Sequence, residues 1–297
     1  MRTRRFLPAL FLFLAVDASA QTTPIAGHYP PGQSGIRGAA ALPPGWGFTN
    51  FNRFFSNIDV RDPQGNAVRA VDEIRYANIS MFTWTTAHEV AGMAYGAMAG
   101  IPFSTGNLTP SSEDVGSSSF GLGDVLLTPV ALYGSKPKLD FTVQFTVWSA
   151  SGAYEAGGSK NRGAGFWSLV YSLGAVAYPG PDRLWSASAL TRIEQNLEQS
   201  ETGITPGDDV VIDWGIGRRI PRHGLDVGAS GFATWQLTDQ SGGTAPAPGR
   251  YRYFGAGPEG SLALTDRVTA RLRAHWEFGA RNAVQGNNLW LLLHCKL

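Results

Sequence analysis

The sequence has little charge and almost no cysteine. Cys295 is the only cysteine, which excludes an internal disulfide and a cysteine-rich metal site. Only 16% of the residues are charged, whereas soluble domains have about 25%. The net charge of +1 gives no case for binding nucleic acid, so nucleic acid is not an expected partner.

After the first twenty residues, the chain also lacks an apolar run of the roughly 20 residues that a membrane-spanning helix needs. It has instead 37 glycines and an aromatic content of 11%. Many aromatic residues without a spanning helix favour β structure with an exposed aromatic surface.

The first residues have the pattern of a secretory signal peptide. Arg2, Arg4 and Arg5 precede an apolar run at 6–16, and small residues follow at 18–20. The run is too short for a transmembrane anchor, so we expect export and cleavage after Ala20. The predicted organisation is a signal peptide at 1–20, a Pro/Gly-rich segment at 21–45 and a β-barrel at 46–297.

Apolar and polar residues alternate with a period of two along much of the remaining chain. In segment 139–149 the odd positions from Leu139 to Val147 are apolar, and most even positions are polar. Segment 267–278 places Val268, Leu272 and Trp276 on one face and charged side chains on the other. A strand produces two such faces and a helix does not. Each run also suits a tilted membrane-spanning strand of about 9–11 residues.

We therefore predict an all-β fold, an antiparallel up-and-down transmembrane barrel of about twelve strands. The expected strands lie near 46–58, 73–85, 88–100, 120–133, 138–150, 165–178, 183–196, 208–219, 223–237, 250–264, 267–280 and 288–297. Short turns such as 134–137 alternate with longer segments such as 101–119 and 152–163. This alternation is typical of outer-membrane barrels, whose even strand number returns both termini to the periplasmic side. The sheet has to close because an open edge cannot face lipid.

The segment 21–45 is too rich in proline to form a strand. In an eight-stranded barrel, side chains fill the interior. A barrel of twelve strands is wider, and its side chains alone leave space in the lumen. Two interpretations of the segment stay open: a plug folded into the lumen, or an unattached periplasmic leader.

Short blocks along the mature chain resemble a known family. His28-Tyr29-Pro30-Pro31-Gly32 with Pro43-Pro44-Gly45 resembles its opening, and Gly121-Leu122-Gly123-Asp124 with Thr128-Pro129-Val130 its next block. Thr205-Pro206-Gly207-Asp208, Trp235-Gln236-Leu237-Thr238-Asp239 and Gly257-Pro258-Glu259 continue the pattern in order. The family is named for the meta-pathway of phenol degradation and consists of outer-membrane transporters. The resemblance implies an outer-membrane barrel linked to the breakdown of aromatic or other hydrophobic compounds, and it carries no binding residues over.

The candidate site consists of residues expected to line the lumen or to contact a solute. They are Arg267, Arg271, Arg273, His275, Glu277, Asp140, Gln144, Trp148, Asp213, Asp226, Gln236 and Trp290. The charged members point inward because an arginine facing lipid at the bilayer midplane costs roughly 2–4 kcal/mol. They either select what passes or form an internal network of ion pairs. Tryptophans on the lipid-facing phase are expected in aromatic girdles, whereas Trp148 and Trp290 fall on the inward phase.

The sequence contains no common enzyme motif in the structural context that the motif requires. The run 255–260 reads GxGxxG, but a strand-like segment follows where a dinucleotide site needs a helix. No GxSxG elbow occurs. A lipid hydrolase would need a Ser–His pair such as Ser230 with His275, and the sequence cannot show that they meet.

We expect a passive outer-membrane channel for small hydrophobic or aromatic compounds, with no catalytic residues, metal or cofactor. A solute would enter between loops such as 101–119 and 239–249 and pass the lumen by diffusion. The expected partners are the solute, outer-membrane lipid and the barrel assembly machinery. The alternatives are a structural or surface-binding barrel and the hydrolase.

Overall fold

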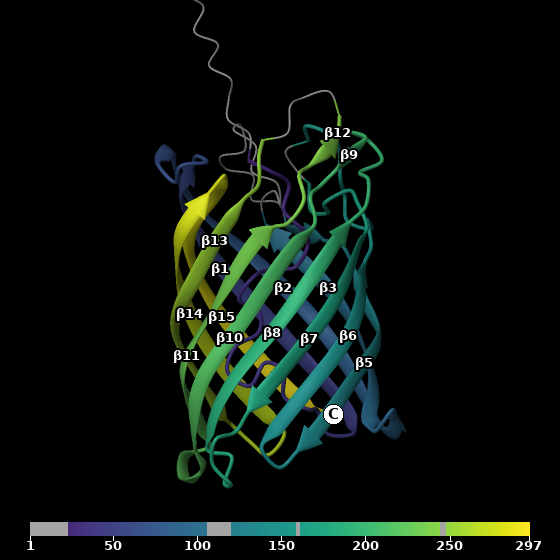
Figure 1. The fold of residues 1–297 in the computed structure, drawn as a ribbon, viewed down its shortest axis with the longest axis vertical. Helices are drawn as coiled ribbons and strands as arrows, with labels where there is room; N and C mark the ends of the chain where they lie inside the picture. Colours follow the sequence, from purple (N-terminus) through teal and green to yellow (C-terminus); the bar gives the residue numbers. More distant parts are fainter. Residues whose placement is uncertain (1–22, 106–119, 159–160, 244–247) are drawn as a thin grey trace, which may run out of the picture.

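The computed structural model describes residues 23–105, 120–158, 161–243 and 248–297, and it shows a closed antiparallel barrel (Figure 1). The wall strands are β1 (Gly45–Arg61), β2 (Ala67–Val90), β3 (Met93–Thr105), β5 (Leu126–Lys136), β6 (Leu139–Trp148), β7 (Ser168–Ala177), β8 (Trp185–Asn196), β10 (Asp209–Ile220), β11 (Leu225–Gln236), β13 (Arg252–Ala263), β14 (Val268–Arg281) and β15 (Ala283–Lys296). Each pairs with its neighbours along the chain, and β1 pairs with β15 to close the sheet. The prediction of a twelve-stranded barrel is confirmed.

In the part of the chain that the structure describes, three short strands and a 3₁₀ turn lie outside the twelve wall strands. β4 (Phe120–Leu122) pairs with the end of β3 ahead of β5. β9 (Ile204–Thr205) and β12 (Ser241–Gly242) pair with each other in a separate ribbon above one rim (Figure 1). A single 3₁₀ turn, Pro221–His223, joins β10 to β11.

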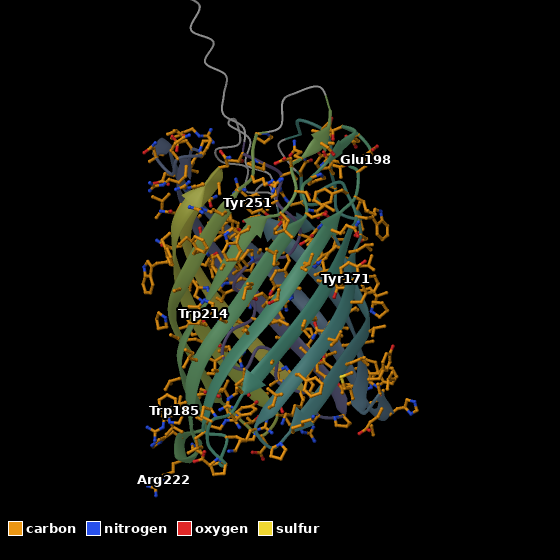
Figure 2. All side chains as sticks on the ribbon, viewed as in Figure 1. Tyr171, Trp185, Glu198, Trp214, Arg222 and Tyr251 are labelled. Carbon is orange, nitrogen blue, oxygen red and sulfur yellow. The ribbon has the colours of Figure 1, made fainter. Side chains whose placement is uncertain are left out.

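Alternation along the strands separates a lipid face from a lumen face. Along β6 the even positions from Asp140 to Trp148 point inward, and all but Gln144, which is half-buried, are buried, whereas the odd positions are more exposed. Along β14, Leu272, Trp276 and Phe278 are exposed on the outside. Figure 2 shows the labelled Trp185 near the lower rim and Tyr171 in the upper half, both at the outer surface. The described part of the chain contains no helix long and apolar enough to cross a membrane.

The two rims differ in the length of the connections between strands. At the rim where β15 ends, here called the short-turn rim, the connections are short. At the opposite rim, the long-loop rim, the connections β6–β7, β8–β10 and β11–β13 are long. Two connections at the long-loop rim are nevertheless short: residues 62–66 between β1 and β2, and Asn282 alone between β14 and β15.

The boundaries of the second and third strands differ from the prediction. We predicted strands at 73–85 and 88–100, whereas β2 continues to Val90 and β3 begins at Met93. The turn consists of Ala91 and Gly92, with positive φ angles of 53° and 76°. Two positive φ angles fit a two-residue type I′ hairpin turn. Ala-Gly is not its usual sequence signature, which explains why the turn was misplaced.

The segment 23–44, here called the lumenal segment, runs inside the barrel from the long-loop rim to the short-turn rim (Figure 1). Its beginning is bonded to the long loops, since Ile25 N donates to Gln240 Oε1 at 3.3 Å. Near its end Ala39 packs against Val176, Tyr178 and Leu190 at the short-turn rim. The predicted signal peptide at 1–20 lies outside the described residues, as do 106–119 and 244–247 of the predicted entrance loops.

Candidate functional site

The outer end of the lumenal segment is held by His28, which lies between two carboxylates. Its Nε2 is 3.2 Å from Asp124 Oδ2, and its Nδ1 is 3.2 Å from Glu194 Oε1. The ring also stacks on Trp148 with centroids 5.4 Å apart. Burial alone would lower the pKa of His28, but hydrogen bonds to Asp124 and Glu194 outweigh it and raise the pKa to about 9. His28 is therefore a cation at neutral pH.

The middle of the lumenal segment is bonded to Asp213 of β10. Tyr29 Oη donates to this carboxylate at 2.6 Å, and the backbone N–H groups of Gly32 and Ser34 donate at 2.8 and 2.9 Å. Arg192 of β8 completes the set, with Nη1 3.3 Å from Asp213 Oδ2. Because a buried carboxylate needs several donors, these bonds fix the segment and the acid together.

The inner end of the lumenal segment meets two further acids. Ile36 N donates to Glu259 Oε2 at 3.1 Å, and Arg37 Nε donates to Asp226 Oδ2 at 2.6 Å. Arg273 of β14 donates through Nε to Glu259 at 2.8 Å and through Nη1 to the carbonyls of Gly32 and Gln33. The acids and bases of the wall thus pair with each other and with the segment's backbone.

Close approach of backbone to wall requires glycine at two places. A Cβ on Gly35 would lie 1.9 Å from Glu259 Oε2, so no other residue fits there without displacing the acid. On the facing wall, a Cβ on Gly215 of β10 would lie 2.5 Å from Ile36 N. Both glycines let the segment lie directly on the strands.

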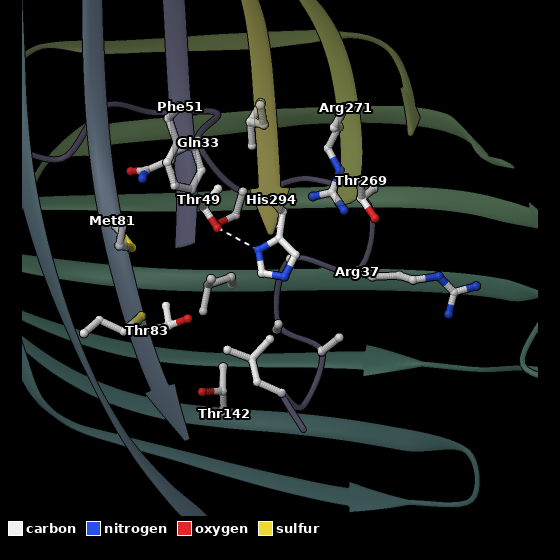
Figure 3. A pocket seen from close by; sticks show the side chains of 18 of the residues that line it. Gln33, Arg37, Thr49, Phe51, Met81, Thr83, Thr142, Thr269, Arg271 and His294 are labelled. Carbon is white, nitrogen blue, oxygen red and sulfur yellow. Dashed lines mark hydrogen bonds between the residues drawn. The ribbon is translucent and has the colours of Figure 1, made fainter. Parts of the chain in front are cut away.

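Two cavities flank the lumenal segment. The inner cavity, about 640 Å³, lies toward the short-turn rim and is bordered by Arg219, Arg271 and His294. The outer cavity, about 290 Å³, lies toward the long-loop rim and is bordered by Arg53, Asp124 and Glu194. Figure 3 shows Arg271, Thr269 and Arg37 together on one side of the inner cavity, with Phe51 and Met81 on the other.

An apolar cluster on the lumen face borders both cavities. It consists of Ile79, Leu126, Trp148 and Val170, with Phe51 and Met81 packed against it, and it is here called the apolar wall. Ile79 and Trp148 line the outer cavity, while Leu126, Val170, Phe51 and Met81 line the inner cavity together with Trp148. The interior of a membrane barrel is usually polar, so an apolar cluster that borders both cavities is unusual.

The predicted site residues fall into four groups. Arg273, Asp213, Asp226 and Asp140 are buried in ion pairs, the last with Arg183 at 2.5 Å. Gln144, Trp148 and Arg271 line the inner cavity, and Glu277 lines the outer cavity. Gln236, His275 and Trp290 are buried within the lumen and border neither cavity, and Arg267 is exposed in the turn before β14.

Sequence reasoning missed several residues that organise the lumen. Asp124 and Glu194, which hold His28, and Glu259, which holds Arg273, were not among the candidates. Glu194 shares the inward phase of β8 with Arg192, so phase along the strand could have identified it. Asp124 lies between strands, and only its three-dimensional contacts reveal its role.

The structure brings Ser230 and His275 together, with Oγ and Nε2 3.0 Å apart. Both residues are buried in the middle of the wall. Nδ1 of His275 has no hydrogen-bond partner among the described residues, so no acid or amide orients the ring. A hydrolytic Ser–His pair requires such an orienting group and access for the substrate. This pair offers neither. Within the described residues no group of three or more metal-binding side chains occurs.

Comparisons with solved structures agree with this barrel. The COG4313 outer membrane channel from Pseudomonas putida F1 superposes with a TM-score of 0.73 at 13% identity, over 91% of this chain and 100% of that chain. The TodX monoaromatic hydrocarbon channel (a deltaS2 mutant) gives a TM-score of 0.45 at 9% identity, covering 89% of this chain and 97% of that chain. The KdgM porin gives 0.42 at 8% identity, covering 84% and 99%. At these identities the likeness concerns the fold.

The search of curated proteins finds no match to the sequence. A family model does match, under the description "Putative MetA-pathway of phenol degradation", over residues 60–293. The match spans most of the barrel and includes the blocks around Thr128, Thr205 and Gly257 on which the resemblance was based. The chain therefore belongs to the MetA-pathway of phenol degradation family, and it folds as an outer-membrane barrel.

Proposed function

We propose that this protein is a passive channel for small hydrophobic or aromatic compounds across the outer membrane. The observation that carries the proposal is the apolar wall, which borders the outer and the inner cavity alike. This cluster faces open cavity volume, where a solute can contact it. A hydrophobic or aromatic solute gains from an apolar surface that the two cavities share.

Trp148 and Tyr29 border both cavities, so they form the partition that a solute has to pass. Trp148 belongs to the wall, whereas Tyr29 belongs to the lumenal segment. We infer that the lumenal segment acts as a partial plug, which leaves a route along the apolar wall and fills the rest. Asp213, Asp226 and Arg273 hold the segment in place. Gln144 and Trp148 contact the passing solute.

Two comparisons support this proposal. The structure with the TM-score of 0.73 is an outer membrane channel by its title. The family description refers to phenol degradation, which concerns aromatic compounds. The lipid-facing exterior implies contact with outer-membrane lipid, and insertion would depend on the barrel assembly machinery.

The test is conductance of the refolded protein in planar bilayers, with and without phenols and alkanes. We expect small, stable steps that an aromatic solute reduces. Trp148→Ala removes the wall's part of the partition and should raise the conductance several-fold and weaken block by the solute. Trp276→Ala is the matched control, since the same substitution falls on the lipid face, where Trp276 is 57% exposed.

A silent bilayer, with the protein shown to be folded and with Trp148→Ala equally silent, would overturn the channel. The structural or surface-binding barrel would then be the better interpretation. Equal effects of both tryptophan substitutions would overturn the route along the apolar wall.

A further inference from the structure

The ion pairs around the inner cavity contain more arginines than acids. Asp226 is shared by Arg37, at 2.6 Å, and Arg219, at 3.8 Å. Glu259 is shared by Arg273, at 2.8 Å, and Arg271, at 3.3 Å. In each case one carboxylate serves two guanidinium groups, so the lining carries an excess of positive charge.

Among these arginines, Arg271 has N–H donors that are not used in hydrogen bonds to the described residues. Arg273 is fully buried and uses its nitrogens on Glu259 and on two carbonyls of the lumenal segment. Arg271 makes the ion pair with Glu259 but, among the described residues, no hydrogen bond. Its side chain borders the inner cavity and is 30% exposed. A guanidinium has five N–H donors, so Arg271 can bind another anion.

The register places Arg271 in one row with the apolar wall. Arg271 faces Leu292 of β15, which faces Phe51 of β1, which in turn faces Ile79 of β2. Neighbouring strands lie about 4.8 Å apart, so Arg271 and Phe51 are about 10 Å apart along the wall. Figure 3 shows the cavity between them, with Arg271 and Phe51 on opposite sides. One small molecule can therefore contact both.

We propose that the inner cavity is a binding site for small aromatic carboxylates, with the carboxylate on Arg271 and the ring against Phe51 and Met81. This inference rests on the proposed function and narrows its substrate class from hydrophobic or aromatic compounds to aromatic acids. A guanidinium binds a carboxylate through two parallel N–H···O bonds, and the excess of arginine disfavours a cation. The apolar side of the cavity favours a ring over a small hydrophilic anion.

The test is equilibrium dialysis of the full mature chain in detergent micelles, corrected for empty micelles, against three probes. Benzoate has ring and charge, benzyl alcohol has the ring alone, and acetate has the charge alone. We expect benzoate to bind at least tenfold more tightly than either of the others. Arg271→Gln should weaken benzoate about tenfold and leave benzyl alcohol unchanged, since it removes one charge-assisted contact.

The matched control is Arg267→Gln, which makes the same change four residues earlier in an exposed turn outside both cavities. It should leave all three probes unchanged. Phe51→Ala should weaken benzoate and benzyl alcohol together. Folding of every variant is checked by its β circular dichroism and its heat-modifiable migration in gels.

Equal binding of benzoate and benzyl alcohol, or an equal loss with Arg267→Gln, would overturn the proposed site. No binding of benzoate to a protein that conducts and is blocked by phenol would also overturn it, while leaving the channel intact. Conversely, benzoate binding that depends on Arg271 in a protein without conductance would support the site and overturn the channel.

Discussion

His28 joins four parts of the molecule through one ring: the lumenal segment, the stretch before β5, strand β8 and, through Ser168 Oγ at 2.7 Å, strand β7. Its two ring nitrogens face Asp124 and Glu194, and both can donate only when the imidazole is protonated. Protonation of this side chain therefore strengthens the outer attachment of the lumenal segment, to which the backbone N–H groups of His28 and Tyr29 also contribute through Glu194.

The pKa of His28, raised from 6.5 to about 9, predicts how this attachment depends on pH. Its contribution to stability is complete below about pH 6.5 and is lost as the pH rises through 9. We expect the thermal midpoint to fall and the conductance to rise between pH 7 and pH 10. Both are measured on the refolded protein.

His28→Gln should reduce this pH dependence and resemble the wild type at high pH. His223→Gln serves as control because His223 lies in the exposed turn between β10 and β11. If His28→Gln and the wild type respond to pH in the same way, His28 is not the controlling group.

At the scale of elements, the lumenal segment depends on close contact with the strands. Gly35→Leu should displace the segment from Glu259, because even a Cβ at this position would lie 1.9 Å from the carboxylate. We expect a larger conductance and cleavage of the segment by added protease, with the barrel still folded. Gly260→Ala is the control, since a Cβ there meets only Val227 Cγ1, at 3.9 Å. A segment that remains protected in Gly35→Leu would contradict its direct seating on Glu259.

The strands were largely predictable from sequence and the lumenal segment was not. Alternation placed Asp140 and Arg273 on the inward phase of their strands, because a membrane wall has only two faces, and both side chains are buried in the structure. The hairpin at Ala91 and Gly92 was misplaced, since these residues carry no strong turn signal. The partner of each charge could not be predicted. His28 meets Glu194 across 166 positions of the chain, and no local pattern encodes such a contact.

The sequence did indicate one part of the candidate site. Trp148 fell on the inward phase of a strand whose other inward residues are polar, and it lies at the junction of both cavities. The rest of the apolar wall was missed because Ile79, Leu126 and Val170 come from three different strands. Each of them is an ordinary strand residue by itself. They form a surface only when the barrel closes.

At the scale of the whole molecule, the exterior has to match lipid. Leu173, in the middle of β7, is 65% exposed on the outer face. Leu173→Arg should lower the free energy of unfolding in lipid vesicles by about 2–4 kcal/mol, the cost of arginine at the midplane. Leu197→Arg, in the loop that follows β8, should cost less than 1 kcal/mol, as is usual for surface positions away from the membrane (about ±0.5 kcal/mol). Denaturant titration of both variants measures the difference, and equal costs would place Leu173 outside the membrane.

The course of the lumenal segment also constrains the order of assembly. Its partners Glu194, Asp209, Asp213 and Glu259 lie 165 to 223 residues later in the chain, so they are synthesised long after it. Closure of β1 on β15 then encircles the segment, which afterwards can leave only lengthwise through a rim. The lumenal segment must therefore already lie inside the curling sheet when the last strand pairs with the first. If β1 pairs with β15 while the segment is still outside the sheet, the closed barrel prevents the segment from entering sideways through the wall.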